Sequence, residues 1–144
     1  MPLSQLSVFV ENKPGAMAKL TAVLDKTKIK IFALSIAEAG EAGLIRLVVN
    51  EPNAAVEYLE SAGFSLAKSK KNVEIIVVLV TETHKLSEIM SLLASNEINI
   101  DYAYSSSIHL DGKSALILRV SDPVTSEKIL RENGVRVLEM KDLQ

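Results

Sequence analysis

The 144-residue sequence contains no cysteine and no tryptophan, and aromatic residues make up only 4% of it. The lack of cysteine excludes disulfides, thiolate zinc sites and cysteine nucleophiles. So few aromatic rings leave little surface on which nucleic-acid bases could stack. The net charge of −2, with scattered basic residues, argues against a basic face for phosphate groups. We therefore expect no nucleic-acid partner.

Long apolar runs are also missing. The longest, "IIVVLV" (75–80), is far too short to span a bilayer, and no apolar signal segment follows Met1. The hydrophobic share of 48% and the charged share of 24% are typical of a globular chain. We expect a cytoplasmic protein with no membrane partner.

The chain contains the same pattern twice. The segment "VFVENKPGAMAKLTAVLDKTKIKIFALS" aligns with "VLVTETHKLSEIMSLLASNEINIDYAYS" once one loop residue is skipped, and "VNEPNAAVEYLESAGFSL" aligns with "VSDPVTSEKILRENGVRVL". The paired positions include Leu20 with Ile89, Leu24 with Leu93, Leu59 with Leu130, and Gly63 with Gly134. The polar stretch "AKSKKN" (67–72) between the copies indicates a linker. We predict two units, residues 1–69 and 70–144.

Hydrophobic periodicity predicts the same six elements in each unit, in the order strand, helix, strand, strand, helix, strand. In the first unit the strands are expected at 5–10, 29–37, 43–49 and 64–67, and the helices at 16–27 and from Pro52 to Gly63. In the second unit the strands are expected at 74–80, 98–108, 114–120 and 135–139, and the helices at 86–96 and from Pro123 to Gly134.

Local turn and cap signals support these boundaries. The pair Asp111-Gly112 predicts a tight hairpin turn. Asp122 is well placed to cap a helix that has proline at its first position. Gly63 and Gly134 suit the left-handed residue that often follows a helix.

The element order βαββαβ, with right-handed crossovers, predicts an α+β fold of two tandem ferredoxin-like units. Each unit should hold a four-stranded antiparallel sheet with both helices on one face. Strand 74–80 is apolar on both faces, and Phe9 lies on the face away from the helices. Such strands indicate that the second sheet face is partly buried, between the units or between chains. We predict a homodimer.

Enzyme chemistry has few candidate residues. His84 and His109 are the two histidines, and neither is spaced with an acid and a nucleophile as in a catalytic triad. No glycine-rich phosphate loop or carboxylate pair is visible either. We interpret both histidines as solvated polar residues. We expect no catalytic residues, no metal site and no cofactor, and hence a protein that is not an enzyme.

The loop "ENKPGAM" (11–17), between the first strand and the first helix, has two explanations. Turn chemistry alone would have Asn12 cap a turn and Gly15 relieve backbone strain. A ligand pocket would use the free N–H groups of the helix N-terminus, the close approach that Gly15 permits, and the donor and acceptor of the Asn12 amide. The loop by itself leaves both explanations open.

The wider sequence resembles the ACT domain family, small modules that bind amino acids and regulate metabolism. The resemblance covers both units and rests on "ENKPGAMAKLTAVL", "KIKIFALSIAE" and "GLIRLVV" in the first and on "NEINIDYAYSSS" in the second. The chain is similar in particular to small stand-alone proteins made of two ACT units. The resemblance implies an amino-acid-binding regulatory or sensor protein. The alternatives are an oligomerisation or interaction scaffold, or a regulatory subunit with an enzyme or regulator partner on another chain.

The resemblance also implies where the ligand binds, namely between the first loop of one unit and the second strand of a neighbour. The implied site residues are Asn12, Lys13, Pro14, Gly15, Ala16 and Met17 in the loop, and Tyr104, Ser105 and Ser106 on the opposing strand. Ordinary strand packing is the alternative role for Tyr104. The second loop, "TETHKLS" (81–87), lacks the asparagine, proline and glycine of the first, so the family's ligand loop is expected once per chain.

Overall fold

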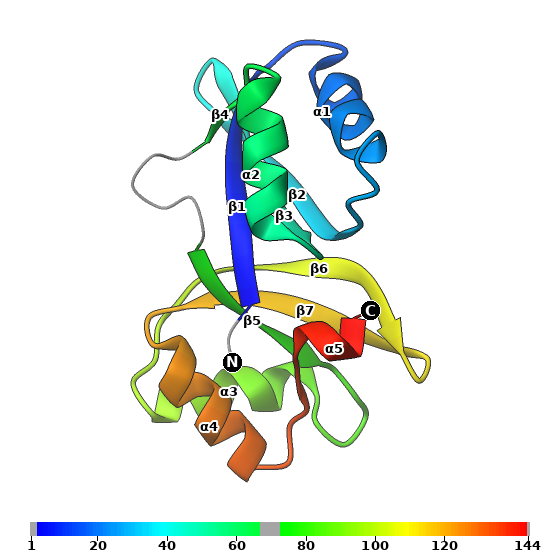
Figure 1. Cartoon of the computed structure of the whole chain (residues 1–144). Coiled ribbons are helices and arrows are strands. Elements are labelled where there is room, and N and C mark those ends of the chain that lie inside the picture. The colour runs from blue at the N-terminus through cyan, green and yellow to red at the C-terminus, as the bar shows by residue number, and fades with distance from the viewer. Residues whose placement is uncertain (1–2, 67–72, 144) are drawn as a thin grey trace. The chain divides into compact units, whose positions relative to one another are not determined.

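The structure is a computed structural model that describes residues 3–66 and 73–143 (Figure 1). The chain folds into two compact units. We call Ser4–Val73 the N-terminal unit, and the C-terminal unit includes Glu74–Gln144. The predicted linker at 67–72 and the predicted boundary between residues 69 and 70 lie outside the described residues. Among the residues that are described, no helix is long and apolar enough to cross a membrane.

The N-terminal unit contains the six predicted elements in the predicted order. They are β1 (Leu3–Glu11), α1 (Ala16–Asp25), β2 (Ile31–Ala39), β3 (Ala42–Val49), α2 (Pro52–Ser61) and β4 (Ser65–Leu66). Antiparallel pairing of β2 with β3, of β3 with β1, and of β1 with β4 gives the sheet order β2-β3-β1-β4. Strand β2 therefore lies at one edge of this four-stranded sheet.

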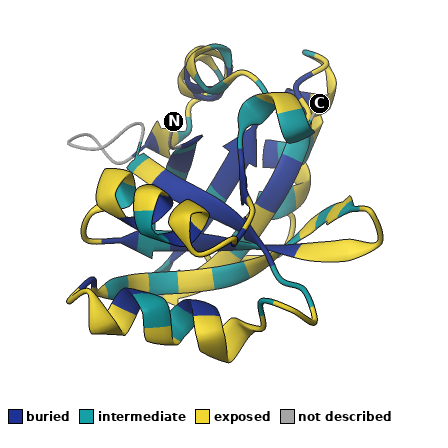
Figure 2. Ribbon diagram, turned by 90° about the horizontal axis from the view of Figure 1, so that it is seen from below, coloured by how far each residue is buried: buried dark blue, intermediate teal, exposed yellow. Residues whose placement is uncertain are grey.

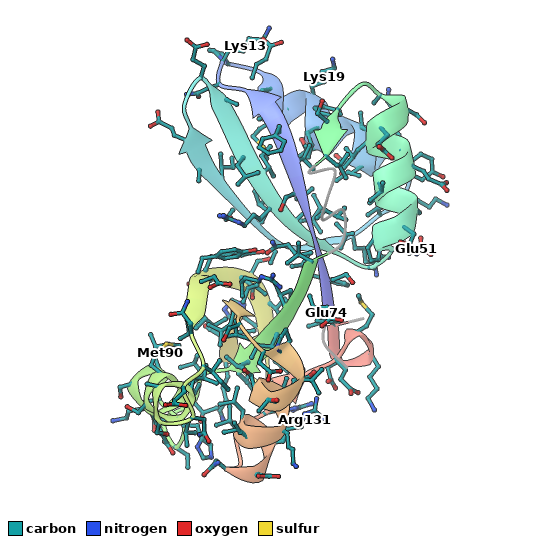
Figure 3. All side chains as sticks on the ribbon, turned by 90° about the vertical axis from the view of Figure 1, so that its left-hand side faces the viewer. Lys13, Lys19, Glu51, Glu74, Met90 and Arg131 are labelled. Atoms are coloured by element: carbon teal, nitrogen blue, oxygen red, sulfur yellow. The ribbon has the colours of Figure 1, made fainter. Side chains whose placement is uncertain are left out.

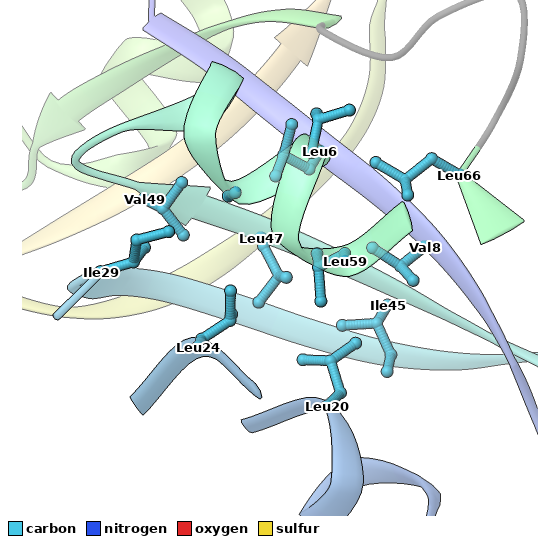
Figure 4. Close-up of a cluster of buried hydrophobic side chains, with 12 residues drawn as sticks. Leu6, Val8, Leu20, Leu24, Ile29, Ile45, Leu47, Val49, Leu59 and Leu66 are labelled. Carbon is cyan, nitrogen blue, oxygen red and sulfur yellow. The ribbon is translucent and has the colours of Figure 1, made fainter. Parts of the chain in front are cut away.

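One hydrophobic core joins the sheet of the N-terminal unit to both of its helices. Every second residue of β1 and of β3 points to the same face, where α1 and α2 pack. The central side chains are Leu6, Val8, Leu20, Leu24, Ile45, Leu47 and Leu59, all fully buried (Figure 4). Both helices thus cover one face of the sheet, as predicted.

The C-terminal unit repeats this arrangement. Its elements are β5 (Val73–Leu79), α3 (Leu86–Ser95), β6 (Ile100–Leu110), β7 (Lys113–Val120), α4 (Pro123–Glu132), β8 (Val137–Leu138) and α5 (Met140–Leu143). The antiparallel pairs give the order β6-β7-β5-β8. The short helix α5 was not predicted.

The core of the C-terminal unit is built from the positions that align with the first core. Its fully buried members come from β5, α3, β7 and α4 and include Val78, Ile89, Leu93, Leu118 and Leu130. Figure 2 shows that strands carry most of the buried positions, whereas helices combine buried and exposed residues. The fold is therefore the predicted α+β pair of ferredoxin-like units.

The predicted turn and cap residues adopt the expected conformations. Asp111 and Gly112 have φ angles of 55° and 74°, the positive values that a two-residue hairpin turn requires. Asp122 accepts a hydrogen bond from the Thr125 N–H at 3.1 Å, so it caps α4. Hydrogen bonding to Thr125, through its side chain first and this backbone N–H second, lowers the pKa of the Asp122 carboxyl below its ordinary value.

Both long helices that follow the hairpins end in the same way. Gly63 and Gly134 have φ angles of 91° and 81°. The next N–H group donates back to the helix in each case, from Phe64 to the Leu59 carbonyl at 3.0 Å and from Val135 to the Leu130 carbonyl at 2.9 Å. Such helix ends favour glycine, because a Cβ is strained in this conformation.

Candidate functional site

The loop between β1 and α1 is held by short-range interactions. The Lys13 N–H donates to the Glu11 carbonyl at 2.9 Å, and the Lys13 ammonium lies 2.7 Å from the Glu11 carboxylate. Gly15 is the N-cap residue of α1 and has a φ of 90°, which explains a glycine at this position by backbone angle alone. The Asn12 side chain makes no hydrogen bond within the described residues, so it does not cap the turn.

A pocket of about 620 Å³ opens at this end of the N-terminal unit. It lies among the end of β1, the loop, the first turn of α1, the β2–β3 hairpin and the connection from α2 to β4. Four of the six predicted loop residues line it, namely Lys13, Pro14, Gly15 and Ala16. Asn12 and Met17 do not line it, and Met17 packs against the core instead.

The N-terminus of α1 gives this pocket a positive side. The N–H groups of Gly15 and Met17 have no hydrogen-bond partner among residues 3–66 and 73–143, and that of Ala16 is bonded weakly to the Lys13 carbonyl at 3.4 Å. No acidic residue lies in the first turn of α1. Free N–H groups and the helix dipole together attract an anionic group.

Lys19, one helical turn beyond Gly15, adds a full positive charge. Its ammonium lies 5.7 Å from the centre of the Phe64 ring and forms no ion pair within the described part of the chain. Figure 3 shows Lys13 and Lys19 at the same end of the N-terminal unit. Since Lys13 is paired with Glu11, Lys19 is the lysine available to a ligand.

The pocket also contains negative charge and apolar surface. The acidic residues Glu11 and Glu41 belong to its lining. The Lys13 ammonium beside Glu11 lowers the pKa of that carboxyl below its ordinary value, with a smaller contribution from Lys19. The apolar residues Phe9 and Phe64 belong to the lining as well. It can therefore accommodate a small molecule with both charges and an apolar part.

The predicted opposing wall lies on β6 of the C-terminal unit. The rings of Tyr102 and Tyr104 stack with centroids 6.3 Å apart, which agrees with a packing role for these residues. The Ser106 hydroxyl donates to the Ala115 carbonyl at 3.0 Å, and Ser105 is paired with Leu116 of β7. A position of Tyr104, Ser105 and Ser106 opposite the first loop stays a prediction.

The two histidines have different surroundings. His109 is exposed on β6, with Nδ1 3.0 Å from the Ser107 carbonyl. His84 lies in the loop before α3, and its side chain is only 22% exposed, so our interpretation of it as a solvated residue was wrong. The described residues include no group of three or more side chains suited to hold a metal ion.

Sequence reasoning missed the pocket residues outside the loop. Lys19 could have been found, because residues four apart share one face of a helix and Lys19 follows Gly15 at that spacing. No spacing or motif in the sequence connects Glu41 or Phe64 with the loop. They reach the pocket only through the folding of the hairpin and of the α2–β4 connection.

Comparisons with known proteins agree with this fold. The structure is similar to that of protein BT0572 from Bacteroides thetaiotaomicron, with 28% identity, a TM-score of 0.86, and coverage of 99% of this chain and 96% of that one. The regulatory subunit of aspartate kinase from Thermus thermophilus, in a ligand-free form, matches with 14% identity, a TM-score of 0.62 and 91% of each chain. The corresponding subunit from Thermus flavus matches with 16% identity, a TM-score of 0.59, and 91% of this chain and 90% of that one. The two subunits show a shared fold.

A search of curated protein sequences found no match. The family model of the ACT domain pair, however, matches residues 1–144. This match spans both units and agrees with the resemblance found in the loop and strand motifs. The chain therefore belongs to the ACT domain pair family.

Proposed function

We propose that this protein is an amino-acid-binding regulatory or sensor protein whose ligand occupies the pocket of the N-terminal unit. One observation carries the proposal. The first turn of α1, with its free N–H groups, lines the same pocket as the basic residue Lys19 and the acidic residue Glu41. A zwitterion is the small molecule that such an arrangement suits, because each of its charges meets a group of opposite sign.

The proposed mode of binding assigns one role to each part of the pocket. The ligand carboxylate binds at the N-terminus of α1, next to Gly15 and Lys19. Its ammonium group lies toward Glu41, because Glu11 is already paired with Lys13. The side chain of the ligand packs on the ring of Phe64, and burial of apolar surface there contributes about 25 cal/mol per Å².

A contact with a second copy of the chain is part of the proposal. Strand β2 is an edge strand, and it exposes Leu34 and Ile36, the latter to 55%. The aligned positions on β6 are Ala103 and Ser105, which expose far less apolar surface. We propose that β2 contacts a second chain in a cytoplasmic homodimer. A monomer by light scattering at micromolar concentration would contradict this contact.

That apolar edge also favours the second candidate function, an interaction scaffold or a regulatory subunit without a ligand. An enzyme or regulator on another chain would be its partner. A thermal-shift screen of the twenty amino acids separates the two candidates. A ligand at 100 times its Kd should stabilise the native state by about 2.7 kcal/mol. If none of the twenty raises the Tm, the scaffold becomes the better proposal.

Calorimetry on three variants then tests the position of the site, with the best amino acid from the screen as ligand. Lys19→Gln should weaken binding tenfold or more, about 1.4 kcal/mol. The control Lys85→Gln makes the same change at a lysine of the second loop and should leave affinity unchanged. Asn12→Ala should leave the Tm unchanged, because its side chain makes no hydrogen bond within the described residues. Equal effects of the two lysine changes would place the site elsewhere.

A further inference from the structure

The two glycines that end α2 and α4 have different surroundings. Both have positive φ angles, 91° at Gly63 and 81° at Gly134. A Cβ added at Gly63 would meet no heavy atom of the described residues within 4 Å, and Gly63 lines the open pocket of the N-terminal unit. A Cβ added at Gly134 would lie 3.1 Å from Nε2 and 3.5 Å from Cε1 of His84. The imidazole of His84 therefore occupies the space over Gly134 that is open over Gly63.

Two hydrogen bonds to Thr81 hold the backbone of His84 in the loop. The His84 N–H donates to the Thr81 hydroxyl at 2.9 Å, and the Thr81 N–H donates to the His84 carbonyl at 3.1 Å. On the other side, His84 Nδ1 lies 3.5 Å from a carboxylate oxygen of Glu88. Nδ1 is buried and makes no hydrogen bond to any residue that the structure describes. The ring thus lies between the Glu88 carboxylate and Gly134.

The alignment of the two units explains the difference. Leu20 aligns with Ile89 and Leu24 with Leu93, an offset of 69 residues, so His84 aligns with Gly15. The same offset aligns Glu88 with Lys19. The N-terminal unit has no side chain at Gly15, whereas the C-terminal unit has the imidazole of His84 there. The N-terminal unit has the cation of Lys19, whereas the C-terminal unit has the carboxylate of Glu88.

We infer that His84 fills, from within the chain, the C-terminal unit's counterpart of the N-terminal pocket. The protein then takes one amino acid per chain at these loops, not two. The inference that His84 fills this space depends only on the position of its ring against Gly134. The count of one ligand per chain rests on the proposed function of the first pocket.

Removal of the ring tests the inference directly, with free imidazole as the probe. His84→Ala should lower the Tm, and millimolar imidazole at about pH 8, where it is mostly neutral, should restore roughly 2 to 4 °C of it. Imidazole should not change the Tm of the unmodified protein or of His109→Ala, which removes an exposed histidine. A His84→Ala protein that imidazole fails to stabilise contradicts the inference.

A double-mutant cycle gives a second test that needs no added ligand. Gly134→Ala and Gly63→Ala place a Cβ on the same strained backbone, but only the first meets the His84 ring. Gly134→Ala should therefore lower the Tm more than Gly63→Ala does. In a His84→Ala background the two changes should cost the same. If the excess loss at Gly134 persists without the ring, His84 does not occupy this space.

Stoichiometry separates this inference from the proposed function. Calorimetry with the best amino acid of the screen should give one ligand per chain. Two ligands per unmodified chain would overturn the inference and leave the proposed function intact. If no amino acid binds while imidazole still stabilises His84→Ala, the proposed function fails and the filled pocket stands.

Discussion

The two units share one fold, but two aligned positions near the start of their first helices, α1 and α3, hold very different residues. In the N-terminal unit these positions hold Gly15 and Lys19, and the end of the unit is open and carries a cation with no ion pair in the described part of the chain. In the C-terminal unit they hold His84 and Glu88, and the ring of His84 lies against Gly134. A duplicated fold therefore need not carry a duplicated site, because a site depends on a few side chains that the core does not constrain.

The two hydrophobic cores, in contrast, are built from aligned positions. The prediction with the largest expected effect tests whether aligned core residues contribute equally to the free energy of unfolding. Leu59 and Leu130 are aligned, fully buried, and placed on the second long helix of each unit. Leu59→Ala and Leu130→Ala should each lower the free energy of unfolding by about 2 to 5 kcal/mol, since each removes buried methyl groups and leaves a cavity. Chemical denaturation measures both losses. A cost below about 1 kcal/mol for one of them would show that its unit relaxes around the cavity.

The shared part of the molecule was also the predictable part. The duplicated apolar pattern, the turn at Asp111-Gly112 and the glycines after α2 and α4 predicted the order and type of twelve elements, and the structure confirms them. Helix α5 was not predicted, because its four residues, Met140–Leu143, are too few to show helical periodicity.

The distinctive part was predicted only in outline. The loop residues Lys13 to Ala16 line the pocket, because they are consecutive and their motif is local. Glu41 and Phe64 come from other elements, and nothing in their local sequence indicates a common site. The role of His84 was missed for the same reason, since its neighbour Gly134 lies fifty residues further along the chain.

A charge reversal at Lys19 should have the next largest effect. It places a carboxylate in the N-terminal pocket, as Glu88 does at the aligned position of the C-terminal unit. Lys19→Glu should weaken amino-acid binding about a hundredfold, close to 2.8 kcal/mol, since it replaces the cation beside the ligand carboxylate with a like charge. Glu88→Lys, the reverse change at the aligned position, should leave the affinity of the first pocket unchanged. Isothermal titration calorimetry measures both. Unaltered binding by Lys19→Glu would exclude a ligand carboxylate at this position.

A smaller effect is expected where the two units cap their helices differently. The side chain of Asp122 accepts a hydrogen bond at the start of α4, whereas that of Glu51 makes no capping hydrogen bond to the described residues at the start of α2. Asp122→Ala should therefore lower the urea midpoint of unfolding, because it leaves an N–H group of the first turn without its partner. Glu51→Ala should leave the midpoint nearly unchanged. Equal losses from the two changes would mean that the hydrogen bond to Thr125 contributes no stability.

The smallest effect expected is the pH dependence of that cap. Hydrogen bonding to the Thr125 side chain, and then to its backbone N–H, lowers the pKa of Asp122 in the folded state, below the value of about 3.9 in an unfolded chain. A carboxyl whose pKa is lowered by folding stabilises the native state above the unfolded pKa, and this contribution is lost as the pH falls through the folded pKa.

Asp122→Asn isolates this contribution, because asparagine is also a good N-cap but does not titrate. All other carboxyls are common to the two proteins, so their titration cancels when urea midpoints are compared. The stability advantage of the unmodified protein over Asp122→Asn should be constant near neutral pH. It should shrink below about pH 4, where Asp122 begins to bind a proton. A difference that stays the same from neutral pH to about pH 3 would show that the Asp122 charge does not strengthen the cap.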